Sequence, residues 1–194
     1  MNFNRCIYMI FIVFSFLLSG QEELIIKKTS QDSLDNVIIS LLEDINKVPD
    51  FSLKSNKGDL YNIRDLEGKV ILLNFWATWC GPCRMEIPEL NEMQAKYGED
   101  NFMILGISIS DTKKALDDFM KYYEVEYPLL YGNPKEIEKV LIDYGGIFSV
   151  PTSILINKKG EEIFSYPGAI LKSYDRYDGV YSAINNKIQS ALED

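Results

Sequence analysis

The chain has 194 residues, of which 46% are hydrophobic and 25% are charged, and its formal net charge is −9. This composition is typical of a globular protein with a buried core and excludes a largely disordered chain. The negative charge and the lack of a basic stripe argue against a nucleic-acid partner, because phosphate binding needs clustered Lys and Arg. The sequence contains no histidine, so the commonest general base and metal ligand are absent.

The N-terminal segment has the pattern of an export signal. One arginine precedes an apolar run from Ile7 to Leu18, and small and acidic residues follow it. Such a run is short for a membrane span but suits the apolar region of a secretory signal. We therefore expect residues 1–20 to be a signal peptide or a membrane anchor, and the protein to function in the periplasm or at the outer face of the cytoplasmic membrane. Disulfides persist in such compartments.

The rest of the chain divides into a polar segment and a globular domain. Residues 21–48 are polar, with apolar residues at helical spacing from about Ser33 to Lys47. Residues 49–194 have the pattern of one α/β domain. It opens with two short strands around an Asn-Lys-Gly-Asp turn, and Lys69–Trp76 then forms a continuous apolar run. Such a run is typical of a strand that is buried on both faces of a parallel sheet.

After this strand the sequence alternates between helical spacing and short apolar runs. The strand–helix–strand order, followed by an antiparallel hairpin, predicts a mixed central sheet with helices on both faces. The expected helices lie at about 81–97, 113–123, 137–144 and 174–192, and the expected strands lie at about 101–110, 127–131 and, as a hairpin, within 151–166.

Cys80 and Cys83 have two residues between them, a spacing found in zinc sites, structural disulfides and redox pairs. Structural zinc needs four Cys or His ligands, and the chain without residues 1–20 offers only this one pair. We therefore expect no metal. A disulfide that closes so short a loop constrains the unfolded chain little, which makes a purely structural staple the weaker explanation.

A redox role for this pair has a physical mechanism. Gly81 and Pro82 predict the start of a helix, because a proline in the first turn has no N–H to leave unpaired. The positive end of the helix dipole then favours the thiolate of Cys80. Cys83 lies one turn further on, so we expect Cys80 to attack and Cys83 to resolve. Trp79 would shield one side of the pair, although an aromatic residue there could equally belong to the core.

Two stretches carry a specific resemblance to a known family. NFWATWCGPCRMEIP resembles the active-site segment of the thioredoxin superfamily, in particular its exported branch, the TlpA/ResA-like thiol–disulfide oxidoreductases. SVPTSILINKKG resembles the second signature of that superfamily, in which a cis proline faces the disulfide. The resemblance covers about Val48 to Asp194. It implies a thioredoxin-like α/β fold with an N-terminal β-hairpin and a βα insertion before the cis-proline loop.

The resemblance also implies roles for single residues. It makes Cys80 the nucleophile, Cys83 the resolving cysteine, Pro151 the cis proline and Val150 the residue whose backbone pairs with an extended substrate segment. Cys80, Cys83 and their neighbours therefore form the expected site. The redox-active disulfide itself is the only redox group that this mechanism needs.

The position of the acid differs from that in cytoplasmic-type thioredoxins. These proteins carry a buried Asp in the strand before the motif, where this sequence has Asn74. The exported branch uses an acid after the next strand, which corresponds to Asp111. Asp111 could instead cap the helix that begins near Lys113, or do both.

The sequence thus predicts an exported thiol–disulfide oxidoreductase that acts as a monomer on protein thiols and disulfides of the cell envelope, with a membrane electron donor. The Gly81-Pro82 dipeptide and the branch favour a reductant, and cytochrome c maturation is one role of the branch. Two alternatives remain open. A peroxiredoxin-like peroxidase shares the fold, but Thr78 lies two rather than three residues before Cys80 and the matching proline is absent. The other is a secreted binding domain with an inert disulfide.

Overall fold

The structure is a computed structural model that describes residues 34–38, 46–98 and 100–194. The chain divides into two compact units, Met1–Ile45 and Asn46–Asp194. The second unit contains the sheet, Cys80 and Cys83, and every site described below. Within the described ranges, no helix has the length and apolar character needed to cross a membrane.

Part of the N-terminal prediction lies outside the described residues. This applies to the expected signal peptide or anchor at 1–20 and to most of the helix expected at 33–47. Residues 34–38 are helical. The predicted end of that helix is wrong, because Lys47 forms an isolated antiparallel β-bridge with Glu161.

Within the described residues, seven strands form one mixed sheet in the order β2-β1-β5-β4-β3-β6-β7. The pairs β3–β4 and β4–β5 are parallel. The pairs β1–β2, β1–β5, β3–β6 and β6–β7 are antiparallel. This topology confirms the predicted thioredoxin-like α/β fold. The strands are β1 (Ser52–Ser55), β2 (Leu60–Asn62), β3 (Val70–Trp76), β4 (Phe102–Ser108), β5 (Leu129–Tyr131), β6 (Thr152–Ile156) and β7 (Glu162–Tyr166).

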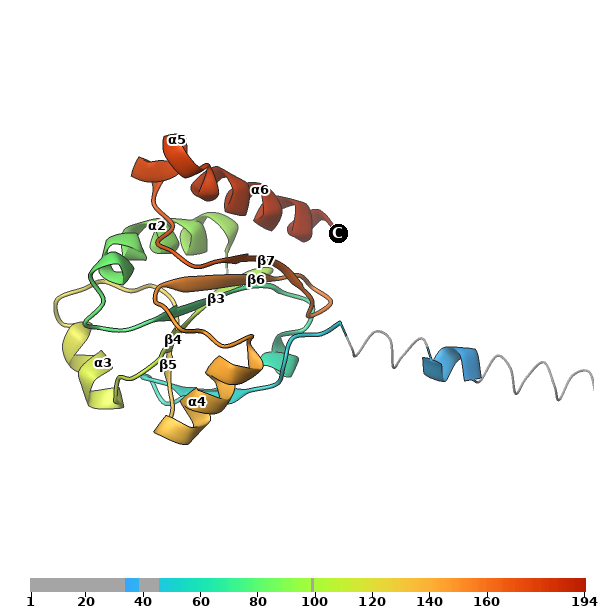
Figure 1. The fold of residues 1–194 in the computed structure, drawn as a ribbon, viewed down its shortest axis with the longest axis horizontal. Coiled ribbons are helices and arrows are strands. Elements are labelled where there is room, and N and C mark those ends of the chain that lie inside the picture. Colours follow the sequence, from blue (N-terminus) through green and yellow to red (C-terminus); the bar gives the residue numbers. More distant parts are fainter. Residues whose placement is uncertain (1–33, 39–45, 99) are drawn as a thin grey trace, which may run out of the picture. The chain divides into compact units, whose positions relative to one another are not determined.

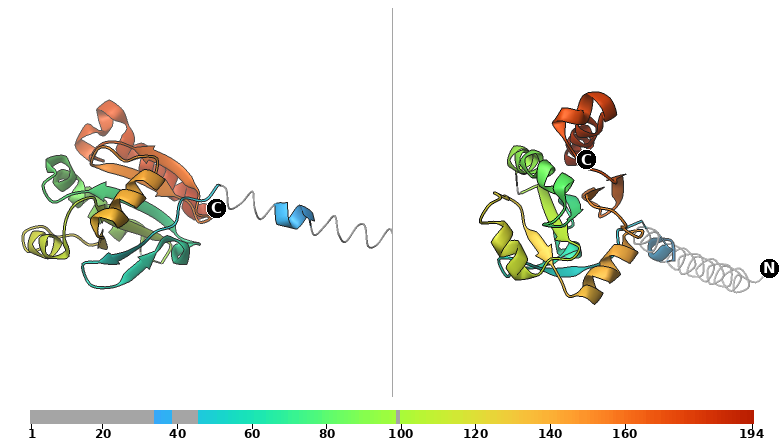
Figure 2. Two further views of the ribbon diagram at one scale, coloured as in Figure 1. Left: turned by 60° about the horizontal axis from the view of Figure 1, so that its bottom comes forward. Right: turned by 60° about the vertical axis from the view of Figure 1, so that its left-hand side comes forward.

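Helices cover both faces of the sheet. Figures 1 and 2 show α2 and α6 on one side of the sheet and α4 on the other. The helical elements are η1 (Ile63–Leu66), α2 (Gly81–Tyr97), α3 (Lys113–Phe119), α4 (Pro134–Asp143), η2 (Lys172–Tyr174), α5 (Asp175–Asp178) and α6 (Val180–Glu193).

The central strand β3 is buried along its whole length, as its apolar run predicts. Side chains alternate across a strand, so Leu72 and Trp76 belong to the core shared with α2, α3 and α6. Leu73 and Phe75 belong to the core on the opposite face, which is shared with α4. The two cores therefore hold β3 in place from both faces. Cys80 and Cys83 follow shortly after the end of this strand.

Two helix boundaries differ from the prediction. The helix expected at 113–123 ends at Phe119, whose carbonyl oxygen accepts N–H bonds from both Tyr122 and Tyr123 in a tightened last turn. The helix expected at 174–192 is interrupted at Gly179, between α5 and α6. Gly179 has a φ of +66°, a left-handed conformation that glycine adopts readily and that ends a helix.

Gly106 provides a test of the packing behind the site. A Cβ atom at Gly106 would lie 2.9 Å from Leu129 Cδ2 and 3.2 Å from Trp76 Nε1. We expect Gly106→Ala to lower the free energy of unfolding by about 1–3 kcal/mol, because the added methyl group overpacks the core. Chemical denaturation of the oxidised protein measures this change. Gly81→Ala is the matched control, because a Cβ there has no described atom within 4 Å; equal stability of Gly106→Ala and the wild type would contradict the expectation.

Candidate active site

The turn after β3 places both cysteines at the start of α2. β3 ends at Trp76 and α2 begins at Gly81, so Cys80 is the N-cap residue of the helix. Its sulfur accepts the backbone N–H of Cys83 at 3.2 Å. The predicted position of Cys80 at a helix N-terminus is therefore confirmed, and the unpaired N–H groups there favour a negatively charged sulfur.

The two cysteines form a disulfide with an S–S distance of 2.03 Å. The outer cysteine, Cys80, is 4% exposed and the inner cysteine, Cys83, is 1% exposed, so the two residues differ little in burial in this oxidised state. Trp79 is 63% exposed and donates its indole N–H to the hydroxyl of Ser110 at 3.0 Å. Trp79 thus lies at the surface beside the disulfide and does not belong to the core.

The loop before β6 also lies next to the disulfide. The Val150–Pro151 peptide bond is cis, as the family resemblance implies. The ladder between β3 and β6 pairs Phe75 with Thr152, so the residues before β6 lie beside those that follow β3. The carbonyl oxygen of Val150 lies 3.7 Å from the Cys80 sulfur. A backbone acceptor therefore stands next to the sulfur at the helix N-terminus.

Asp111 is bound to the turn that precedes Cys80. The predicted role as helix cap is wrong, because Thr112 is the N-cap residue of α3 and accepts the N–H of Ala115. The Asp111 carboxylate instead accepts the Thr78 N–H at 2.8 Å, the Thr78 hydroxyl at 2.6 Å and the Ser108 hydroxyl at 2.7 Å. These bonds tie the loop after β4 to the turn that presents the cysteine. A role of Asp111 as the acid remains a prediction.

Glu86 is a candidate functional residue that the sequence pattern does not single out. This residue lies three positions after Cys83 on α2 and is 0% exposed, and side chains at this spacing share one side of a helix. Its Oε1 atom accepts from the Asn74 amide at 2.9 Å, and its Oε2 atom accepts the Ile170 N–H at 2.8 Å.

Burial raises the pKa of Glu86 to about 7, and the hydrogen bonds from Ile170 and Asn74 oppose this shift. The charge of Glu89 adds to the increase. A carboxyl group with a pKa near neutrality can both take up and release a proton at the pH at which the protein works. Glu86 is therefore the described group best suited to acid–base chemistry behind the disulfide.

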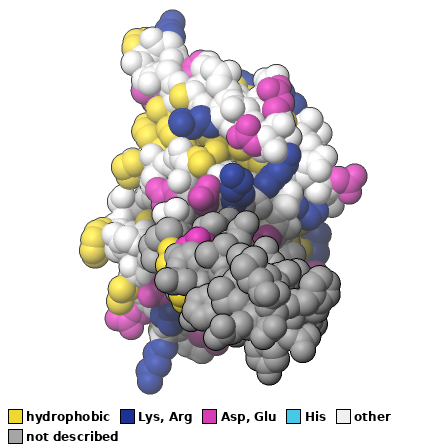
Figure 3. All heavy atoms as spheres, turned by 90° about the vertical axis from the view of Figure 1, so that its right-hand side faces the viewer, with side chains coloured by type: hydrophobic (Ala, Val, Ile, Leu, Met, Phe, Trp, Pro, Cys, Tyr) yellow, Lys and Arg dark blue, Asp and Glu magenta, His cyan; other side chains and the backbone are white. Residues whose placement is uncertain are grey.

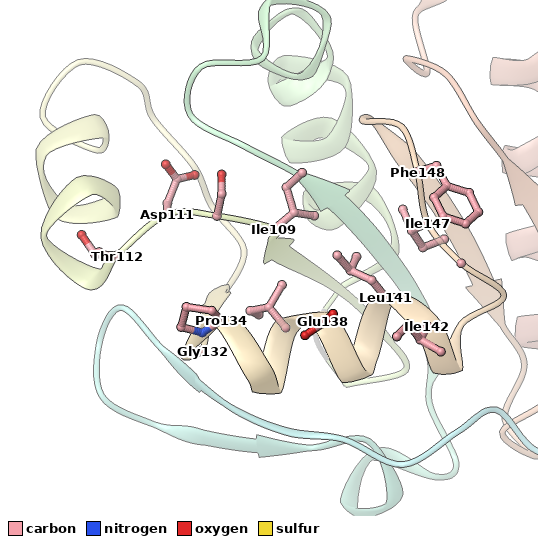
Figure 4. Close-up of a pocket in the computed structure, with 13 residues that line it drawn as sticks. Ile109, Asp111, Thr112, Gly132, Pro134, Glu138, Leu141, Ile142, Ile147 and Phe148 are labelled. Carbon is pink, nitrogen blue, oxygen red and sulfur yellow. The ribbon is translucent and has the colours of Figure 1, made fainter.

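An apolar groove of about 600 Å³ lies beside the site. Figure 4 shows Ile109, from the loop after β4, opposite Leu141 of α4, with Asp111 further along the same loop. Phe148, three residues before Pro151, lies at one end of the groove and is 97% exposed. The groove thus connects the loop that is hydrogen-bonded to the Thr78–Trp79 turn with the loop that leads into the cis proline.

Other kinds of site find no support in the part of the chain that the structure describes. None of its Cys, Asp and Glu side chains gather in a group of three or more that could hold a metal ion. On the face shown in Figure 3, the visible Lys and Arg side chains are interspersed with Asp and Glu. The reactive features of the described residues are the disulfide, the adjoining backbone and the buried acid.

Comparisons with known proteins agree with this site. Residues 45–161 match the AhpC/TSA family. The thiol-disulfide oxidoreductase ResA of Bacillus thuringiensis subsp. konkukian is 34% identical over 122 residues, which cover 63% of this chain and 68% of that protein.

Two solved structures share the fold. A thiol:disulfide interchange protein of the thioredoxin family from Chlorobium tepidum is 28% identical, with a TM-score of 0.61, and the match covers 76% of this chain and 96% of that one. The pneumococcal exposed lipoprotein thioredoxin Etrx1 from Streptococcus pneumoniae is 26% identical, with a TM-score of 0.58, over 71% of this chain and 99% of that one. The chain therefore belongs to the AhpC/TSA family of thioredoxin-like proteins and is a thiol–disulfide oxidoreductase.

Proposed function

We propose that the protein is an exported reductant of protein disulfides in the cell envelope. One observation carries this proposal: the Cys80–Cys83 disulfide at the start of α2 lies beside the Val150 carbonyl, with the buried acid Glu86 one turn away. The cysteine pair carries the two electrons itself and needs no further cofactor. A membrane electron donor would return the pair to the dithiol state, and the protein would act as a monomer.

The reaction proceeds in two balanced steps. In the reduced protein, the Cys80 thiolate attacks one sulfur of a partner disulfide, and the other partner sulfur leaves as a thiolate. The Cys83 thiol then gives up its proton and attacks the Cys80 sulfur of the mixed disulfide. This step closes the Cys80–Cys83 bond and releases the partner as a dithiol. Glu86 accepts the proton of Cys83, because it lies one helical turn from that thiol and titrates near neutrality.

The turn before Cys80 is held by the loop after β4. Asp111 binds the backbone N–H and the hydroxyl of Thr78, and Ser110 accepts the indole N–H of Trp79. In this proposal Asp111 keeps the outer cysteine presented to a partner.

The apolar groove receives the polypeptide segment that flanks the partner's disulfide. One end of the groove contains Ser110 and Asp111, which bond to the turn before Cys80. The other end contains Phe148, near the Val150 carbonyl. A segment that pairs with the backbone at Val150 would thus extend into the groove. The lining predicts that an apolar side chain of the partner occupies it.

The proposed export is supported by the sequence pattern of residues 1–20 and by the description of one similar protein. The segment has the pattern of a signal peptide or anchor, and the pneumococcal relative Etrx1 is described as an exposed lipoprotein. In such a compartment, partners with disulfides are available to a reductant. Apocytochrome c is one partner class of the exported branch that fits this setting.

Trapping tests the proposed exchange in cells. We expect Cys83→Ala, produced as the full chain, to accumulate mixed disulfides through Cys80 in the envelope fraction, because the resolving thiol is missing. Non-reducing electrophoresis and mass spectrometry identify the trapped partners. The variant that lacks both Cys80 and Cys83 is the control and should trap none. If Cys83→Ala also traps none, the disulfide is inert and the protein is a binding domain. Peroxide consumption by the purified wild type would favour a peroxidase instead.

The reduction potential tests the direction of electron flow. We expect a value near that of thioredoxin, about −270 mV, when the Cys80–Cys83 pair is equilibrated with defined thiol buffers. Trp79 lies beside the pair and provides a fluorescence signal for the two states. A value near about −120 mV would make the protein an oxidant of dithiols.

The groove can be tested by a pair of matched substitutions. Ile142 lines the groove and is 64% exposed, whereas Leu60 on β2 lies outside it and is 66% exposed. We expect Ile142→Lys to lower kcat/KM for the reduction of insulin about tenfold, because a charge replaces apolar contact with the partner. Leu60→Lys should leave it unchanged. Equal effects of the two substitutions would exclude the groove as the partner's binding site.

A further inference from the structure

Buried polar contacts extend from Glu86 into the centre of the sheet. Asn74 on β3 is 2% exposed, and its Nδ2 atom donates to Glu86 Oε1 at 2.9 Å and to the Ser153 hydroxyl at 3.1 Å. Ser153 on β6 is 0% exposed and lies opposite Asn74 in the β3–β6 ladder. One amide group therefore joins helix α2 to two central strands.

We propose that Asn74, oriented by Ser153, is a positioning residue that holds the Glu86 carboxylate in the deprotonated form that accepts the proton of Cys83. The proposal deepens the function proposed above and rests on it, because that function assigns the proton to Glu86. Asn74 would act through Glu86, because its side-chain amide donates to Glu86 and to Ser153.

The hydrogen-bond donors explain why Asn74 suits this task. A buried carboxylate has lost its water, so each of its oxygens needs a donor to remain charged. The Ile170 N–H supplies one at Oε2, and Asn74 supplies one at Oε1. The Asn74 amide has two N–H groups, and Ser153 accepts the second, which fixes the direction of the first. An amide also keeps its donors at every pH, since it does not titrate in this range.

The charged and titratable groups around Glu86 work against its ionised form. Glu89, on the same helix, raises the pKa of Glu86 by repulsion. Tyr127, which precedes β5, is itself buried, and its pKa is raised by burial and by the charge of Glu86. Cys83 titrates only after the disulfide is reduced. The Asn74 amide and the Ile170 N–H are thus the contacts that lower the pKa of Glu86.

The first test measures Glu86 directly, without an assay of activity. In the full-length protein with 13C-labelled glutamate, we expect Asn74→Leu to raise the pKa of Glu86 by about one to two units, because Oε1 loses its donor. Ser153→Ala is the matched control: it removes the second partner of Asn74 but leaves the bond to Glu86, so the shift should be less than half as large. An unchanged pKa of Glu86 in folded Asn74→Leu would overturn the proposal.

The second test follows the resolving step. The reduced protein releases two thiolates from DTNB, the first when Cys80 attacks and the second when Cys83 closes the disulfide. We expect Asn74→Leu to move the midpoint of the pH profile of the second phase upward by the same one to two units, and to leave the first phase unchanged. Glu86→Gln should abolish this titration. A shifted pKa of Glu86 with an unshifted second phase would overturn its assignment as the acceptor.

A second variant keeps the proposal testable if Asn74→Leu does not fold. Asn74→Asp is close in size but replaces a donor with a second carboxyl group beside Glu86. Two carboxyl groups at hydrogen-bond distance cannot both ionise easily, so the pair should retain one proton above pH 7, and carboxyl NMR should show two coupled titrations. Titration of Glu86 as in the wild type would overturn the proposal.

Discussion

The pairing of β3 with β6 is the constraint on which the rest of the site depends. This ladder sets Phe75 opposite Thr152 and, one residue earlier, Asn74 opposite Ser153. A shift by one residue would move every side chain of β3 to the wrong core, so the register is fixed by burial on both faces. The same register brings the Val150 carbonyl to the Cys80 sulfur and brings the Asn74 amide to its partners. One set of backbone hydrogen bonds thus positions both the sulfur chemistry and the proton chemistry.

The site has an outer and an inner part with different physical character. The outer part consists of the exposed Trp79, its partner Ser110 and the Asp111 carboxylate that holds the turn. Trp79 and Ser110 are exposed, and Asp111 is partly exposed. The inner part, Glu86 with Asn74, is buried, so its hydrogen bonds act in a medium of low dielectric constant. The disulfide lies between the two, at the N-terminus of α2.

The sequence predicted those features that are encoded locally. The apolar run of β3 and the Gly-Pro dipeptide after Cys80 fixed the strand, the helix start and the place of the outer sulfur. Glu86 escaped prediction although Cys83, Ile87 and Leu90 around it on α2 are also buried, because a charged residue in an amphipathic helix is ordinarily solvated. Its burial depends on Ile170, which is 84 residues away in the chain. For Asp111 the sequence left open a role as the acid, as a cap or as both; the cap is Thr112, because local sequence does not distinguish two adjacent residues that can accept the same kind of bond.

The burial of Glu86 also has a consequence for the stability of the fold. Its pKa is about 7 in the folded protein against an ordinary value of 4.5, so between these pH values the folded state binds a proton that the unfolded state has released. The contribution of Glu86 to the free energy of unfolding therefore falls as the pH rises from about 4.5 to about 7, by roughly 3 kcal/mol, and levels off above that range. The charged form of this carboxylate thus contributes least to the stability of the fold. The group that equips α2 to exchange protons near neutrality weakens the fold over the same range of pH.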